Sequence, residues 1–417
     1  MAKYVWQGFL PNTFLSIESG FKLNPADGPQ DMIWPKNLSR DYILSFFAQF
    51  AFSSVFCILI PAIPIYLDKF GAKEGEIGFI IGIFSVSSLV LRPFVGKALL
   101  TIPERSFMIA GTVIYTLSCL AYLLAPPFWP LLIVRAIHGV GMAFFATASF
   151  TLLANMTPEP HRGRLISYFY LSFNLAFALG PYLGMLLINR FNFPALFLVC
   201  TGLSLGSFFL TWKLTKRESL PPGKEPFRLQ SFLSRGAIPP AIIAFMLNVI
   251  WASIAAFFPL YALKHGVENP GIFFVFLAAT LLLGRSLGGR ILDIYDRKKV
   301  ILFCLTTIII ALIAFPLADS LGLFILVAVM LGAGWAFLYP ILTIHVIEKA
   351  GLERGPAMGT FTAISDLGSG LGPMVMGLVL ERSGYPVMFG CLIFTAAVNL
   401  GYFYWAIARK AGLVIKS

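Results

Sequence analysis

Long apolar stretches alternate with short polar segments along the chain from residue 42 onward. The hydrocarbon core of a bilayer is about 30 Å thick, and a helix of about 20 mostly apolar residues crosses it. Twelve stretches have this length and character: 42–67, 75–98, 106–126, 129–154, 164–188, 193–212, 237–262, 269–290, 299–318, 321–346, 356–380 and 385–408. The pattern therefore predicts an all-α membrane protein with twelve transmembrane helices.

The two halves of this pattern are similar in sequence. The stretch "SFNLAFALGPYLGMLL" (172–187) recurs 192 residues later as "ISDLGSGLGPMVMGLVL" (364–380), and "LRPFVGK" (91–97) recurs 193 residues later as "GRSLGGR" (284–290). Six helices separate the partners, and because six is even, the halves share one orientation about an axis along the membrane normal. We therefore expect two pseudosymmetric six-helix bundles, at 42–212 and 237–409, joined by a cytoplasmic linker (213–236) and flanked by tails at 1–41 and 410–417.

Composition and charge support a membrane location. Of the 417 residues, 58% are hydrophobic and 12% are charged, whereas soluble domains have about 25% charged residues. Of the 31 basic residues, 23 lie in the segments on one side of the predicted membrane, five lie on the other side, and Arg92, Arg135 and Arg285 lie within helices. This bias predicts a protein of the cell (inner) membrane with both termini on the cytoplasmic side. It also accounts for the net charge of +12, so that nucleic-acid binding is not needed to explain the charge.

Residue patterns typical of enzymes are absent from the sequence. The five cysteines lie singly in apolar runs, and we find no metal-ligand spacing, no phosphate-binding glycine loop and no nucleophile–base arrangement. We therefore expect no enzyme activity, no metal and no cofactor. A proton gradient, rather than ATP, is the expected source of energy.

One acidic residue lies deep within a predicted helix. Of the 19 acidic residues, only Asp366 does so, and counting from Arg354 at about 1.5 Å per residue places it about 18 Å into the membrane. An ionised carboxylate at this depth costs about 3 kcal/mol on insertion scales unless it is paired or faces water. Burial favours the neutral form, so Asp366 is the predicted proton-coupling residue.

Three polar residues of the first half are candidates for substrate binding or coupling. Arg135 is the predicted charged counterpart of Asp366, acting on an anionic group of the substrate or through its charge, and His138 lies one turn away. Asn174 occupies the repeat position of Asp366 and would bind polar substrate or bridge helices. The other two arginines within helices, Arg92 and Arg285, lie toward the cytoplasmic ends, where long side chains extend to the interface, and we interpret both as structural.

A loop motif follows the second helix of each half. In the second half, "GRILDIYDRKK" has a glycine, an aspartate four residues later and a basic cluster: Gly289, Asp293, Arg297 and Lys298. The first copy, "GKALLTIPERS", keeps the glycine (Gly96) but has Leu100 where the aspartate is expected.

Glycine–proline pairs occur at matching positions in both halves. The fifth helix contains "GPYLG" with Gly180, Pro181 and Gly184, and the eleventh contains Gly372 and Pro373. Small residues let neighbouring helices approach closely, and a proline leaves a backbone carbonyl one turn earlier without its helical partner. We expect these residues to act in gating, beside the alternative of ordinary tight packing.

Together with the repeat, these motifs resemble the major facilitator superfamily, in particular its twelve-helix drug and metabolite proton antiporters. The resemblance covers about residues 42–410, and it implies alternating access between two bundles. By analogy with the family, the candidates for lining the central cavity are Gln49, Asn248, Trp251, Trp335 and Tyr339.

These features indicate proton-coupled export of a small organic molecule by antiport. The expected partners are that substrate and the lipid bilayer. Because one chain supplies both bundles, a monomer is sufficient for transport. Three alternatives remain open at this point: a proton-coupled importer (symporter) of a nutrient or organic anion, a lipid translocase, and a membrane sensor without transport.

Overall fold

The computed structural model describes residues 39–126, 128–157, 162–216, 234–350 and 354–408, without the side chains of 162–164, 167, 286–294, 354–356 and 407–408. All regular elements among these residues are helical, which confirms the predicted all-α class. The predicted tails, apart from a few residues, and most of the predicted linker lie outside the described residues.

The elements follow each other with short connections. In chain order they are α1 (Arg40–Lys69), α2 (Glu74–Ala98), α3 (Glu104–Ala121), α4 (Trp129–Met156), α5 (Arg162–Arg190), α6 (Phe193–Trp212), η4 (Arg235–Ala237), α7 (Ile238–Lys264), α8 (Gly271–Ile294), α9 (Arg297–Ala314), η5 (Phe315–Leu317), α10 (Leu321–Ala350), α11 (Arg354–Phe403) and η6 (Tyr404–Ala408). Nine segments of the described chain, with α11 counted once, are long and apolar enough to cross a membrane.

Helix α11 consists of two helices that meet at Gly384. This residue has φ 77° and ψ 175°, a backbone conformation that glycine adopts without the steric cost of a side chain. The break falls between the predicted helices 356–380 and 385–408. With α11 counted as two, the described residues form twelve long helices.

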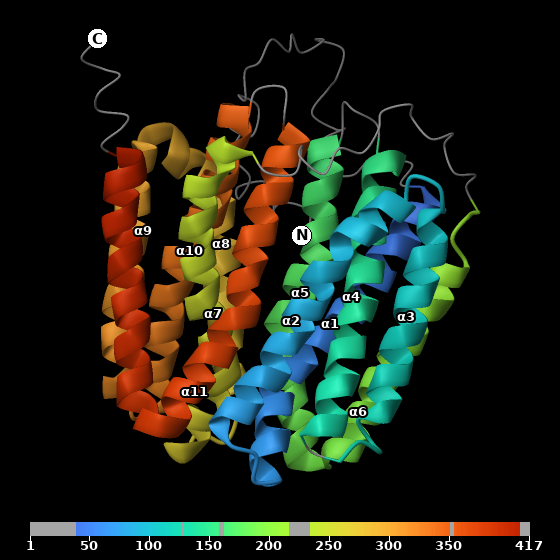
Figure 1. The fold of residues 1–417 in the computed structure, drawn as a ribbon, viewed down its shortest axis with the longest axis horizontal. Helices are drawn as coiled ribbons and strands as arrows, with labels where there is room; N and C mark the ends of the chain where they lie inside the picture. The colour runs from blue at the N-terminus through green and yellow to red at the C-terminus, as the bar shows by residue number, and fades with distance from the viewer. Residues whose placement is uncertain (1–38, 127, 158–161, 217–233, 351–353, 409–417) are drawn as a thin grey trace, which may run out of the picture.

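The helices pack as two similar bundles, which lie side by side in Figure 1 with α1–α6 in blue to green and α7–α11 in yellow to red. In the first bundle α1 packs on α5 and α6, α2 on α4, and α3 on α4 and α6. In the second, α7 packs on α11, α8 on α10, and α9 on α10 and α11. The same helix pairs pack in both halves, so the predicted pseudosymmetric pair of bundles is confirmed.

Aromatic side chains fill the interior of each bundle. Phe52 stacks between Tyr115 and Phe145 in the first bundle, with ring centroids 3.9 and 4.0 Å apart. In the second bundle the rings of Phe258 and Phe273 are 4.0 Å apart. Because both interiors are filled, the place to look for a substrate site is between the bundles.

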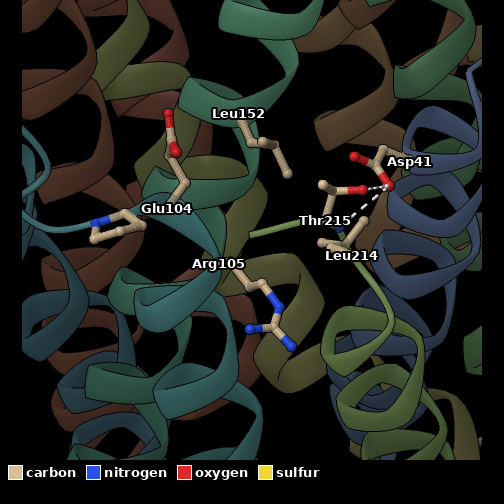
Figure 2. A pocket seen from close by; sticks show the side chains of 7 residues that line it. Asp41, Glu104, Arg105, Leu152, Leu214 and Thr215 are labelled. Atoms are coloured by element: carbon tan, nitrogen blue, oxygen red, sulfur yellow. Dashed lines mark hydrogen bonds between the residues drawn. The ribbon is translucent and has the colours of Figure 1, made fainter. Parts of the chain in front are cut away.

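A small recess lies at one end of the first bundle (Figure 2), where α1, α3 and α4 meet the residues that follow α6. Asp41 Oδ1 accepts hydrogen bonds from the Thr215 backbone N–H (3.3 Å) and hydroxyl (3.1 Å). The Arg105 guanidinium lies 5.6 Å from the centre of the Trp212 ring. These contacts hold the chain after α6 against α1 and α3, which gives the recess a structural role.

Helices of the two bundles contact each other in matching pairs. Helix α2 packs on α11, and α5 packs on α8, which is the same pairing with the halves exchanged; α1 also packs on α7. We refer to the end where α6 ends and α7 begins as the linker end. The opposite end, where α1 ends and α2 begins, is the far end.

Candidate functional site

The two glycine–proline pairs lie in a close contact between the bundles toward the far end. The Pro373 carbonyl oxygen of α11 lies so close to Gly78 of α2 that a Cβ atom on this glycine would overlap it. In the other half, a Cβ atom on Gly271 of α8 would lie 2.5 Å from the Pro181 carbonyl oxygen of α5. Because Gly78 and Gly271 occupy matching positions of the repeat, as the two prolines do, the same contact is formed twice.

The glycines of these pairs hold each helix to its own bundle. A Cβ atom on Gly184 would lie 2.6 Å from the Ile58 carbonyl oxygen of α1, and one on Gly372 would lie 2.7 Å from the Val249 carbonyl oxygen of α7. A Cβ atom on Gly180 would lie 2.5 Å from the Cys57 Cβ atom of α1. The predicted gating residues therefore lie where two helix–helix contacts meet, and the contact made by the proline carbonyl has to separate if the far end opens.

Two polar contacts lie beyond these glycines at the far end. Glu381 of α11 accepts a hydrogen bond from the Gly75 N–H in the first turn of α2 (3.2 Å) and lies 3.8 Å from Lys73 Nζ. Asn189, its repeat partner on α5, donates to the Glu268 carbonyl oxygen just before α8 (2.9 Å). Sequence reasoning did not single out Glu381; the available signal was an acid in one copy of the repeat where the other has an amide.

Glu381→Gln is expected to shift the protein toward states in which the far end is open, by about fivefold in population. The carboxylate is stabilised by the N-terminal dipole of α2 and by an exposed lysine, contacts that together contribute about 1 kcal/mol. The measurement is the distribution of distances between spin labels on the far ends of α2 and α11. Glu268→Gln is the control, because that residue contacts Asn189 through its backbone; an unchanged distribution in Glu381→Gln would contradict the prediction.

An ion pair joins the bundles closer to the linker end. Arg92 of α2 donates through Nη1 to Asp366 Oδ2 of α11. The two side chains remain 37% and 29% exposed, so the pair is not sealed inside the protein. The cation beside Asp366 is thus Arg92 and not Arg135, which corrects the expectation based on depth.

The direction of the side chains explains this pairing. Side chains of an α-helix lean toward its N-terminus, and α2 begins at the far end whereas α11 begins at the linker end. Arg92 therefore leans toward the middle of the membrane and Asp366 leans toward the linker end. The interpretation of Arg92 as a residue that extends to the interface followed from its Cα position alone, about 9 Å from the end of α2, and it is corrected by the ion pair.

Arg135 and His138 lie inside the first bundle. They are 4% and 0% exposed, among side chains of α2, α3 and α4. The Tyr122 hydroxyl lies 2.8 Å from His138 Nδ1 and accepts from Arg135 Nη1 at 3.4 Å, and the Arg135 guanidinium lies 4.5 Å from the centre of the Phe84 ring. In this state they are closed off from the space between the bundles, and their role in binding or coupling stays a prediction.

Two of the predicted lining residues make hydrogen bonds within their own bundle. Gln49 donates to Ser53 (2.8 Å) and accepts from Ser149 (3.0 Å), and it is buried in the first bundle. Asn248 donates to the hydroxyl and the carbonyl oxygen of Ser365, at 2.7 and 2.8 Å. This second contact links α7 to the residue that precedes the ion-paired carboxylate of α11.

The predicted aromatic residues lie at the contact between the bundles. The rings of Trp251 and Trp335 are 5.6 Å apart, and Trp251 also meets Phe177 of α5 at 5.5 Å. Tyr339 packs on Phe361 at 5.4 Å. Aromatic rings from α5, α7 and α10 therefore form an apolar surface between the two halves, where a substrate would contact both.

The loop motif is described only in part. Gly289 and Asp293 lie in the part of α8 whose side chains are not described. A Cβ atom on Gly96 would have no other atom within 4 Å. Arg297 donates to both carboxylate oxygens of Glu348 on α10, at 2.8 and 2.9 Å. This contact lies within the second bundle, so a contact of the motif with the opposite bundle stays a prediction.

Comparison with known proteins gives consistent matches along nearly the whole chain. The sequence matches the profile of the Major Facilitator Superfamily over residues 43–351 and 271–414. It is 25% identical to the staphylopine export protein of Staphylococcus aureus over 378 residues, which cover 86% of this chain and 92% of that protein. The quinolone resistance protein NorA of the same species is 20% identical over 337 residues, covering 78% and 86%.

The fold also matches solved structures. A mutant of the nucleoside transporter NupG superposes with a TM-score of 0.76 over 88% of this chain and 99% of that one, at 13% identity. At this level of identity the match shows only that the helices are arranged in the same fold.

Proposed function

The chain belongs to the major facilitator superfamily, and we propose that it exports a small organic molecule in exchange for protons. It is a multi-pass membrane transporter and not an enzyme. Export is supported by relatives that are named for export or for drug resistance. The proton-coupled exchange is supported by residues of this chain.

The observation that carries the proposal is the ion pair between Arg92 and Asp366 across the two bundles. An arginine stays charged at all relevant pH values, whereas a carboxylate can take up a proton. Protonation of Asp366 removes its negative charge and weakens the contact between α2 and α11. The state in which these two helices are apart then becomes more populated. Loss of the proton restores the contact, and each cycle then moves a proton together with the change of state.

The basic residues support a proposed orientation of the protein in the membrane. The linker end carries most of the lysines and arginines outside the helices, and basic segments stay on the cytoplasmic side. We place the linker end and both termini in the cytoplasm, with the protein in the inner membrane of the cell. The structure, in which the far end is held together, then corresponds to a state closed to the outside.

Flux measurements in liposomes with a pH gradient of either sign test the proposal. A thermal-shift screen at one acidic and one basic pH, including a quinolone because of the relative named for quinolone resistance, supplies the substrate. Accumulation in liposomes with an acidic interior supports antiport, because substrate and proton move in opposite directions. Accumulation of substrate when the exterior is acidic would show symport. A flux of substrate that is the same with and without the pH gradient would contradict proton coupling.

A further inference from the structure

The internal repeat places an amide, and not an acid, at the position that faces one arginine between the bundles. Arg285 of α8 occupies the repeat position of Arg92, and Asn174 of α5 occupies that of Asp366. On the α2–α11 side the arginine bonds a carboxylate. On the α5–α8 side the repeat supplies a neutral amide, and among the described side chains Arg285 forms no ion pair.

Arg285 lies on the face of α8 that is turned toward the other bundle. The direction of this face is shown by Phe274, whose ring meets Phe177 of α5 at 6.5 Å and Trp251 of α7 at 6.3 Å. Arg285 follows Phe274 by eleven residues, which is three helical turns to within about 20°. Since α8 begins at the far end, the arginine side chain leans back toward these rings.

The facing part of α5 presents polar groups. Tyr170 is 48% exposed and lies close enough to Arg285 to interact with it electrostatically. Asn174 follows one helical turn later on the same face and is partly exposed. A hydroxyl group and an amide group are thus placed opposite an exposed guanidinium.

We propose that Arg285, with Tyr170 and Asn174, binds the carboxylate group of an aromatic organic anion; this inference rests on the proposed export function and names the class of its substrate. A guanidinium binds a carboxylate through two parallel charged hydrogen bonds. Arg92 does not take this role in the state described, because it is paired with Asp366. The half-buried ring of Trp251 on α7, which packs against the buried Phe274 of α8 at 6.3 Å, faces the apolar part of the anion. Phe274 lies about 16 Å along α8 from Arg285 before the lean of the arginine side chain.

The test compares naphthaleneacetate with naphthaleneacetamide, which has nearly the same shape and no charge. Binding of each compound to the purified full-length protein is measured by titration calorimetry at a pH where the acid is ionised. The wild-type protein is expected to bind the carboxylate at least about tenfold more tightly than the amide, as for hydrogen bonds between charged groups. Equal affinities, or no binding of the carboxylate, would overturn the proposal.

Asn174→Asp is the decisive variant, because it builds on α5 and α8 the ion pair that the chain already has on α11 and α2. It is expected to lower the affinity for naphthaleneacetate at least about tenfold while leaving naphthaleneacetamide unchanged. Arg285→Gln should have the same effect, and Arg285→Lys should retain part of the preference. Arg190→Gln, at the far end of α5, is the control, and an unchanged preference in Asn174→Asp and Arg285→Gln would contradict the assignment.

Failure of this inference and failure of the proposed function give different results. If flux in liposomes follows the pH gradient but the carboxylate has no advantage over the amide, the export function stands and the anion site is wrong. If the carboxylate is preferred through Arg285 but no flux depends on the gradient, the site stands and proton-coupled export is wrong.

Discussion

Transport driven by a pH gradient is expected to be lost in Asp366→Asn, while exchange of substrate across the membrane stays measurable. Asparagine has the size of aspartate and accepts a hydrogen bond from Arg92, but it does not take up a proton in this pH range. Proton binding can then no longer change the contact between α2 and α11. Exchange needs only the alternation of the two bundles, which remains possible.

The measurement compares two assays on the same liposomes. Accumulation under a pH gradient should fall to the level of liposomes without protein, and counterflow of labelled substrate at equal pH should continue. Glu104→Gln is the matched control, since this carboxylate bonds Asn155 away from the bundle contact (2.6 Å) and its removal should affect neither assay. Normal accumulation in Asp366→Asn would refute the coupling role, and loss of both activities would assign the ion pair a structural role.

Closure of the far end is expected to fail in Gly78→Val. The added Cβ atom would overlap the Pro373 carbonyl oxygen and would lie 3.3 Å from the Gly377 Cα atom, and backbone atoms cannot move aside as a flexible side chain can. The bundles would therefore stay apart at the far end, and accumulation of substrate should fall to background because alternation stops.

Labelling of a cysteine at the contact reports this directly. Met374, whose side chain packs against Gly82, is replaced by cysteine in a chain with Cys391→Ala, because Cys391 is the native cysteine that is not fully buried. A maleimide that does not cross membranes should react slowly with the parent and several-fold faster with Gly78→Val. Gly202→Val, where a Cβ atom would meet nothing within 4 Å, is the control; equal labelling rates in all three proteins would contradict the role of this contact.

The structure shows which contacts are affected by the charge differences between the two halves of the sequence. Two acids that replace amides of the first half, Asp366 and Glu381, lie on α11 and face α2. Their amide counterparts, Asn174 and Asn189, lie on α5. One contact between the bundles therefore contains an ion pair, whereas its pseudosymmetric counterpart has an arginine opposite an amide, although the positions match. The repeat showed that an acid replaces an amide but not which cation it would meet.

Arg135 shows where reasoning from depth fails. Its depth in the predicted helix suggests Asp366 as its partner, whereas its guanidinium lies against Tyr122 and Phe84 within the first bundle. The Cα atom of Arg92 is close to the end of α2, which suggests a residue that extends to the interface, but its side chain leans inward to reach Asp366. Depth along the membrane normal is a property of the sequence, but the neighbour at that depth is not.

The number of helices, their order, the duplication and the position of a lone acid at mid-membrane all follow from the sequence, because a span needs a fixed length of apolar residues and a repeat can be read from matching letters. Tertiary structure alone decided the partners of Asp366, Glu381 and Pro373. The physical reason is that a membrane helix is apolar on the side that faces lipid and on the side that faces its neighbours, so its sequence carries little signal for the direction in which each side is turned.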